Sequence, residues 1–143
     1  MTQVLIRLPN HVGDACMALP AVRAIRDAPL RCTLVGPPWG ESLFAALHVP
    51  YVALRRRRWA DLRRMRALRR RLIADSGDVD AERTVAVRGL LLPNSFGSAL
   101  LFRLAGVPSA GLATDGRGAL LRWPAGAPPD DAHEVLRFHA AAA

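Results

Sequence analysis

The chain has 143 residues, of which 51% are hydrophobic, 6% aromatic and 22% charged. This length suits one ordinary domain, and the hydrophobic fraction is large enough for a packed core, which excludes an intrinsically disordered protein. The formal net charge is +8, which favours an anionic partner over a cationic one.

The positive charge is concentrated in one segment, residues 55–71. This segment, RRRRWADLRRMRALRRR, holds ten arginines and one aspartate and has a formal net charge of +9, whereas the rest of the chain has a net charge of −1. The chain contains no lysine, and the planar fork of arginine binds phosphate and carboxylate groups well. Apolar residues recur here every three or four positions, which predicts a helix with one apolar stripe. The stripe consists of Trp59, Leu62, Met65, Leu68 and Leu72.

Cysteine usage and hydropathy limit the class of protein further. Cys16 and Cys32 are the only cysteines and form no CxxC pair, so neither a zinc site nor a thioredoxin-like site is indicated. The N-terminus lacks a signal-type pattern, and we expect a cytoplasmic protein with reduced thiols. Residues 89–107 are the most apolar, but Pro93 and Arg103 interrupt them, which argues against a membrane-spanning helix.

Strand-like and helix-like segments alternate along the chain. Strands are predicted over 4–8, 31–35, 51–54, 84–92 and 110–113, and helices over 14–26, 39–47, 59–72 and 95–104. Pro20 predicts a kink or a new helix start. Residues 124–129 read as a connector, after which Asp131 and Glu134 fit a capping box. The alternation predicts an α/β fold, a Rossmann-like parallel sheet with helices on both faces.

Three polar loops follow predicted strands, at residues 10–14, 94–98 and 114–118. In open parallel sheets, ligands bind beyond the carboxyl ends of the strands. We therefore expect these loops, although far apart in the sequence, to converge on one binding cleft.

Asp14 has two interpretations. A carboxylate at the start of a helix is most simply a cap or first-turn acid, which the helix dipole stabilises. It could also act as a general base at the mouth of a cleft. Gly13 suits a turn, or lets a ligand approach the backbone. His11 lacks a second histidine or cysteine at metal-ligand spacing, so no metal site is predicted and a surface histidine is preferred.

The residues of the loops at 94–98 and 114–118 also have simple structural interpretations. Asn94 or Ser95 suits a helix cap, although helix-opening amides and hydroxyls also bind anions and sugar hydroxyls. Asp115 and Gly116 form a turn sequence. Arg117 beside them could hold a phosphate or carboxylate, or could simply be solvated.

The arginine-rich segment is more basic than solubility requires. Its partner could be nucleic acid, an acidic membrane surface or a phosphorylated glycan. Nucleic-acid modules often expose aromatic side chains for base stacking. Here the single aromatic, Trp59, is assigned to the apolar stripe, so we expect a phosphate-rich lipid or sugar and no nucleic acid.

Several segments together carry a resemblance to a known family. In order, they are VLIRLPNHVGDACMALPAVRAIR, GLLLPNSFGSALLFRLAGVP, TDGRGALL and HEVLRF. This pattern resembles the N-terminal half of the lipopolysaccharide heptosyltransferases of glycosyltransferase family 9, and most closely the heptosyltransferase II type. The resemblance covers nearly the whole chain and is weakest over 55–83.

The resemblance implies one half of a two-domain enzyme of the GT-B type. In such enzymes the N-terminal domain binds a lipid A–Kdo or heptosylated inner-core acceptor, and the C-terminal domain binds the donor ADP-heptose, with no further cofactor. The acceptor hydroxyl attacks the anomeric carbon and the configuration inverts. Asp14 is then the candidate base. The implied acceptor-binding residues are Asn10, Gly13, Asn94, Ser95, Arg117, Arg63, Arg66 and Arg70. The arginines would also meet the cytoplasmic face of the inner membrane.

Two features depart from the family pattern. His11 stands where the family commonly has an aromatic residue such as tryptophan. The chain also ends before any nucleotide-sugar domain, so we expect an acceptor domain over 1–129 and the start of a connecting helix over 130–143. Such a chain should have little activity alone, and a second chain could supply the missing half. The alternative is a non-catalytic Rossmann-like module that binds anionic lipid or nucleic acid through its arginine-rich helix.

Overall fold

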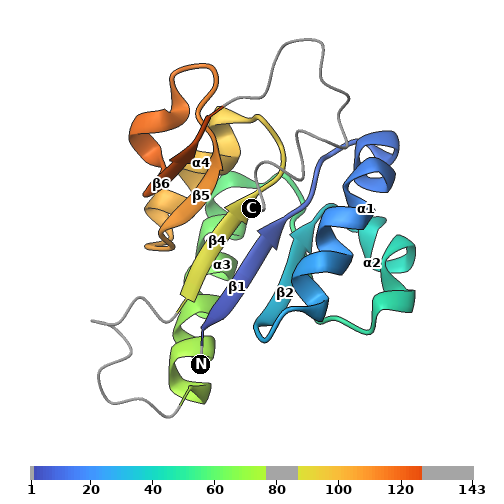
Figure 1. The fold of residues 1–143 in the computed structure, drawn as a ribbon. Coiled ribbons are helices and arrows are strands. Elements are labelled where there is room, and N and C mark those ends of the chain that lie inside the picture. Colours follow the sequence, from blue (N-terminus) through green and yellow to red (C-terminus); the bar gives the residue numbers. More distant parts are fainter. Residues whose placement is uncertain (1, 77–86, 127–143) are drawn as a thin grey trace.

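The computed structural model describes residues 2–76 and 87–126. They form one six-stranded sheet with the strand order β3-β2-β1-β4-β5-β6 (Figure 1). All neighbouring strands are parallel. The strands are β1 (Gln3–Arg7), β2 (Arg31–Gly36), β3 (Tyr51–Ala53), β4 (Val87–Leu91), β5 (Ser109–Leu112) and β6 (Trp123–Ala125). This is the order of doubly wound Rossmann-type sheets, and the predicted fold class is confirmed.

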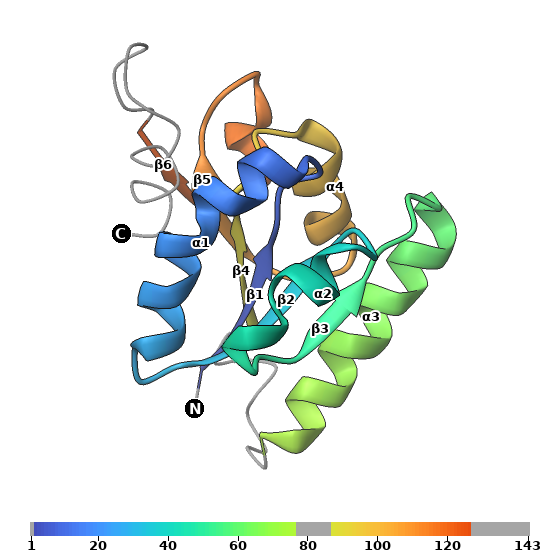
Figure 2. The same ribbon diagram turned by 90° about the vertical axis from the view of Figure 1, so that its right-hand side faces the viewer.

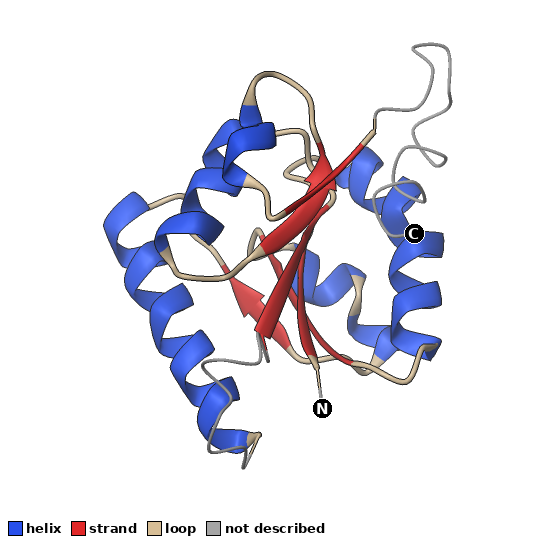
Figure 3. Cartoon of the chain, turned by 60° about the vertical axis from the view of Figure 1, so that its left-hand side comes forward, coloured by secondary structure: helices blue, strands red, loops and turns tan. Residues whose placement is uncertain are grey.

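Helices cover both faces of the sheet (Figure 3). They are α1 (Val12–Asp27), α2 (Gly40–Leu43), α3 (Arg58–Asp75) and α4 (Phe96–Leu104), with two short 3₁₀ turns, η1 (Ala45–Leu47) and η2 (Arg117–Leu120). Successive residues of β1 point to opposite faces, as the strand period requires. Ile6 joins the core beneath α1 and α2, whereas Leu5 joins the core beneath α3 and α4.

The start of the chain differs from the prediction in one respect. Helix α1 begins at Val12 and runs through Pro20 to Asp27 without interruption. Pro20 is exposed, so the carbonyl that lacks an intrahelical donor lies on the solvent side and can be hydrated. The expectation of a new helix start at Pro20 is therefore wrong.

The predicted connector over 124–129 begins instead with a strand. In β6, Trp123 pairs with Ala110 of β5, and Pro124 lies opposite Gly111. Proline is tolerated here because β6 is an edge strand, where one side of the backbone needs no ladder partner. The guanidinium of Arg88 lies 5.3 Å from the centre of the Trp123 ring, a cation–π contact that helps to hold the edge. The capping box and the connecting helix over 130–143 lie outside the described residues.

The apolar stripe of α3 is confirmed except at its first member. Leu62 and Met65 are buried, and Leu68 and Leu72 pack against the same core. Trp59, however, is 76% exposed. It lies in the first turn of α3, on a different side of the helix from the buried Asp61 and Met65. The placement of Trp59 in the core is wrong, and so is the argument against nucleic acid that depended on it.

Candidate functional site

The strand order places a topological switch point at the carboxyl ends of β1 and β4, and we call this edge the crevice. These two strands are neighbours, yet the chain leaves β1 toward β2 on one side and leaves β4 toward β5 on the other. Loops that diverge in this way open a ligand crevice. The loop after β5 lies beside the loop after β4. The topology thus brings the three predicted loops to one edge of the sheet.

A buried arginine organises the first loop. Arg7, at the end of β1, is 6% exposed. Its Nη2 donates to Oδ1 of Asn10 at 2.7 Å, and its Nη1 donates to the carbonyl of Leu8. Burial lowers the pKa of Arg7, an effect that the carboxylate of Asp61 partly opposes. Sequence reasoning missed Arg7, although an arginine within an apolar strand was a usable signal.

Asp14 is the third residue of α1 and lies in its first turn. His11, the N-cap residue of α1, is exposed, and its side chain makes no capping hydrogen bond. The positive end of the α1 dipole therefore stays available at the crevice. The Asp14 carboxylate is partly exposed and accepts no hydrogen bond from another described side chain. This position fits both the first-turn acid and the catalytic interpretation.

One interpretation of Gly13 is that it serves a turn, and the structure contradicts this interpretation. Gly13 lies inside α1 and is not among the described glycines with positive φ. A Cβ added at Gly13 would meet no atom within 4 Å. The space beside the first turn of α1 is therefore open, which fits the interpretation that a ligand can approach the backbone there.

Ser95 and Asn94 have separate roles at the start of α4. Ser95 is the N-cap, since its Oγ accepts from the backbone N–H of Ser98 at 3.3 Å. Asn94 is exposed, and its Oδ1 accepts from Nη2 of Arg117 at 3.2 Å. The Asn94 amide is therefore held at the crevice while its NH₂ group can still donate to a ligand.

The expectation that Arg117 is solvated or holds a phosphate or carboxylate is wrong. Arg117 is fully buried, at 0% exposure, and its Nε donates to the carbonyl of Leu112 at 2.6 Å. Its Nη1 donates to the carbonyl of Pro93 and its Nη2 to Asn94. The same burial lowers the pKa of Arg117. Arg117 thus ties the loop after β5 to the loop after β4, and it is not a solvated cation or an open anion-binding fork.

The turn that carries Arg117 has the expected conformation. Asp115 and Gly116 both have positive φ, 51° and 72°, which glycine adopts freely and aspartate tolerates. The preceding residue, Thr114, has a buried Oγ1 without a hydrogen-bond partner. The turn places Asp115 in solvent and directs Arg117 inward.

The three arginines of α3 do not join this group. Arg66 donates through Nε and Nη2 to the carbonyl of Leu104, at 3.3 and 3.1 Å. Leu104 ends α4, whereas Asn94 and Ser95 precede it. The length of α4 separates Leu104 from Ser95 by about 14 Å, at about 1.5 Å of rise per residue. Arg63 and Arg70 lie on the exposed surface of α3. Arg66 therefore lies at the opposite end of α4 from Asn94 and Ser95.

Within residues 2–76 and 87–126, no group of three or more histidine, cysteine, aspartate or glutamate residues is placed to hold a metal ion. No helix in the same part of the chain is long and apolar enough to cross a membrane.

The fold of this chain is similar to parts of two solved structures. The chain superposes on E. coli ADP-heptose lipopolysaccharide heptosyltransferase II with a TM-score of 0.69 and 23% identity, and the match covers 99% of this chain and 40% of that one. It superposes on E. coli heptosyltransferase WaaC, solved with ADP-2-deoxy-2-fluoro heptose, with a TM-score of 0.69 and 19% identity. The fold is that of part of a heptosyltransferase. This chain covers 47% of WaaC and thus spans less than half the length of either enzyme. No family model and no curated protein sequence matches the chain.

Proposed function

We propose that the chain is the acceptor-binding half of an inverting glycosyltransferase that moves heptose from ADP-heptose to the inner core of lipopolysaccharide. The observation that carries the proposal is the position of Asp14. Its carboxylate stands in the first turn of α1, at the crevice between β1 and β4, beside the open space at Gly13.

In the proposed reaction, Asp14 is the general base. An acceptor sugar hydroxyl attacks the anomeric carbon of the donor, the bond from that carbon to the ADP oxygen breaks, and the hydroxyl proton passes to Asp14.

The neighbouring residues would position the acceptor. Asn94 can donate from its amide to an acceptor oxygen, because Arg117 occupies its carbonyl oxygen. Asn10 is held in the same way by Arg7. Ser95 caps α4 and supports the loop. Arg7 and Arg117 are thus positioning residues whose own guanidinium groups are buried.

The donor would be bound by a second domain or a second chain. Catalysis requires both reactants at attack distance, and the enzymes with the same fold are more than twice as long as the part that this chain matches. A lipid-linked acceptor would place the complete enzyme at the cytoplasmic face of the inner membrane.

Asp14→Asn in a protein that joins this domain to its donor-binding half tests the base. We expect kcat to fall by about 10²–10⁴-fold, the usual contribution of a general base, with acceptor affinity nearly unchanged. Asp27→Asn, at the other end of α1, is the matched control and should keep full activity. Near-parental turnover by a folded Asp14→Asn protein would exclude Asp14 as the base.

The exposure of Trp59 beside the arginines supports a second candidate, a non-catalytic module that binds anionic lipid or nucleic acid. Titration of the chain with inner-core lipid A and with duplex DNA at several salt concentrations separates the two. A bare electrostatic module would bind with steep salt dependence and no preference for the glycan. An acceptor domain would prefer the glycan.

A further inference from the structure

Helix α4 exposes a row of large apolar side chains. Phe96, Leu100 and Leu104 are spaced four residues apart and are 50%, 38% and 50% exposed. Residues four apart share one face of a helix, and this face is opposite to the one that buries Ala99 and Phe102. A contiguous apolar row of this kind on a surface marks an interaction site.

The neighbouring helix adds a row of positive charge. Helix α3 covers the same face of the sheet as α4, and the two begin at the same end of the domain (Figure 2). Arg66 and Leu104, which are hydrogen-bonded, each lie eight residues after the start of their helices. Phe96 is therefore level with the first turn of α3, where Trp59 is exposed. We call the surface formed by Trp59, Arg63, Arg66, Arg70, Phe96, Leu100 and Leu104 the outer α3–α4 face.

Few acids offset these arginines. The single acid among residues 55–71, Asp61, is 6% exposed and accepts from the backbone N–H of Arg55 at 3.1 Å. Among the described residues, α3 makes one ion pair, between Arg71 and Asp75. The outer α3–α4 face therefore presents positive charge beside exposed apolar side chains.

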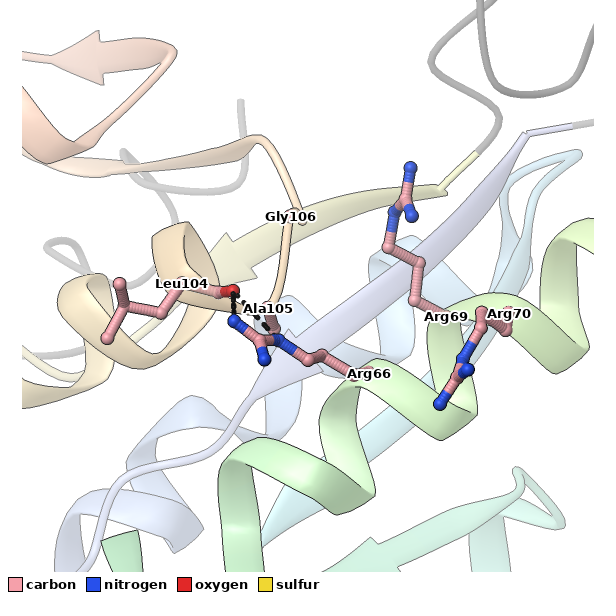
Figure 4. A pocket seen from close by; sticks show the side chains of 6 residues that line it. All are labelled: Arg66, Arg69, Arg70, Leu104, Ala105 and Gly106. Carbon is pink, nitrogen blue, oxygen red and sulfur yellow. Dashed lines mark hydrogen bonds between the residues drawn. The ribbon is translucent and has the colours of Figure 1, made fainter. Parts of the chain in front are cut away.

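A hollow of about 470 Å³ lies at the junction of the two rows. It is lined by Arg66, Arg69, Arg70, Leu104, Ala105 and Gly106 (Figure 4). Arg69 extends along the side of Gly106, and Arg70 points the other way. Gly106 has φ 74° and no side chain to fill the space. The hollow thus offers guanidinium groups next to the apolar edge at Leu104, a combination that suits a phosphate attached to an acyl chain.

We propose that the outer α3–α4 face docks onto an anionic phospholipid bilayer. The apolar row of α4 and Trp59 enter the interface, the arginines of α3 contact lipid phosphates, and the hollow takes one headgroup phosphate. Interfacial helices show this pairing of an apolar row with flanking basic residues, and tryptophan prefers the boundary between lipid and water. A nucleic acid would use the arginines and Trp59, but it would leave the three apolar side chains of α4 without a role.

Sedimentation of the full chain with vesicles tests this docking. Vesicles of phosphatidylcholine alone are compared with vesicles containing about a third phosphatidylglycerol and no glycolipid, so that the result is independent of the proposed transfer. We expect binding at least tenfold stronger to the anionic vesicles. In Leu100→Gln/Leu104→Gln and in Arg63→Gln/Arg70→Gln, this binding should fall at least fivefold.

The chain offers matched controls at other exposed positions. Leu30→Gln/Leu43→Gln removes two comparably exposed leucines, and Arg23→Gln/Arg31→Gln removes the same charge from exposed sites on α1 and β2. Both should bind anionic vesicles like the parent. Equal losses in the test and control pairs would mean that net charge or hydrophobicity acts without a defined face, and would overturn the proposal.

The fluorescence of Trp59 provides a second readout of the docking. The emission of Trp59, taken as the difference between the parent and Trp59→Phe, should shift to shorter wavelength with anionic vesicles and be quenched by brominated lipid. An unshifted Trp59 emission would overturn the proposal. So would binding to a single-stranded oligonucleotide without binding to anionic vesicles.

Discussion

At the scale of single residues, two buried arginines shape the candidate site without contacting a ligand. Arg7 fixes Asn10, and Arg117 fixes Asn94, each through its Nη2 and the amide oxygen. A guanidinium removed from water is costly unless it is hydrogen-bonded. Arg117 also donates to the carbonyls of Leu112 and Pro93, and Arg7 also donates to the carbonyl of Leu8, although its buried Nε has no partner among the described residues. The two loop amides that face the crevice are therefore positioned from within the domain.

The single tyrosine gives a pH-dependent prediction. Tyr51 donates its hydroxyl to the carbonyl of Pro37 at 2.6 Å, and burial raises its pKa from 10.0 to about 12. The folded state thus binds this proton more tightly than the unfolded state. Its contribution to stability is complete below about pH 10 and is lost as the pH rises from about 10 to about 12. Unfolding free energy should fall across this window in the parent and fall less in Tyr51→Phe.

Ultraviolet absorbance of tyrosinate checks the same prediction directly, because the chain has one tyrosine. In the folded protein the absorbance should rise with a midpoint near the raised pKa. A midpoint at the ordinary value for tyrosine would show that the hydroxyl is not held as described.

At the scale of elements, α3 combines a structural and a surface role. Its inner side closes the core through Leu62 and Met65, while Asp61 turns inward to the backbone of Arg55. The guanidinium of Arg64 donates to the carbonyl of Ala53, so side chains of α3 hold the connection from β3 at Ala53 and at Arg55. Its other arginines remain on the surface, where they set the charge of the outer α3–α4 face.

Two substitutions in α3 separate these roles. Met65 is fully buried, so Met65→Ala should lower the free energy of unfolding by about 2–5 kcal/mol. Trp59→Ala, at an exposed position, should change it by less than about 0.5 kcal/mol. Denaturant unfolding monitored by circular dichroism measures both. A large loss in Trp59→Ala would mean that this side chain packs against the domain.

At the scale of the whole molecule, the sheet gathers the residues of the proposed site at one edge. The strand order directs the loops after β1, β4 and β5 to one edge. That edge carries the proposed base and two positioned amides. The outer α3–α4 face lies on one side of the sheet, with α1 and α2 on the other (Figure 2). Docking through the outer face would leave the loop edge accessible to a donor-binding partner.

This division of surfaces predicts that the chain alone transfers no heptose. With ADP-heptose and an inner-core acceptor, release of ADP should not exceed the rate without protein, because the acceptor-binding half that we propose would not by itself hold the anomeric carbon at attack distance. Joining the chain to a donor-binding half should restore release. Hydrolysis of ADP-heptose without acceptor is the control. Transfer by the chain alone would contradict the proposed division of labour.

The sequence by itself determined the α/β class, the position of most elements and the three polar loops. These features depend on local hydrophobic periodicity and on turn residues, which short windows of sequence contain. It also located Ser95 as a cap candidate and Asp14 in the first turn of a helix. Their catalytic or binding roles stay predictions, because the same residue types serve as ordinary caps.

Only the tertiary structure decided which polar groups are buried and which apolar groups are exposed. Arg117 is enclosed because acceptors from Pro93 and Leu112, remote from each other in sequence, meet around it. Trp59 is exposed, although its spacing matches the core stripe, because the first two turns of α3 bury the side that carries Asp61 and Met65. Strand β6 exists because β5 offers it an edge. Burial and pairing depend on neighbours distant along the chain, and a local pattern carries no information about them.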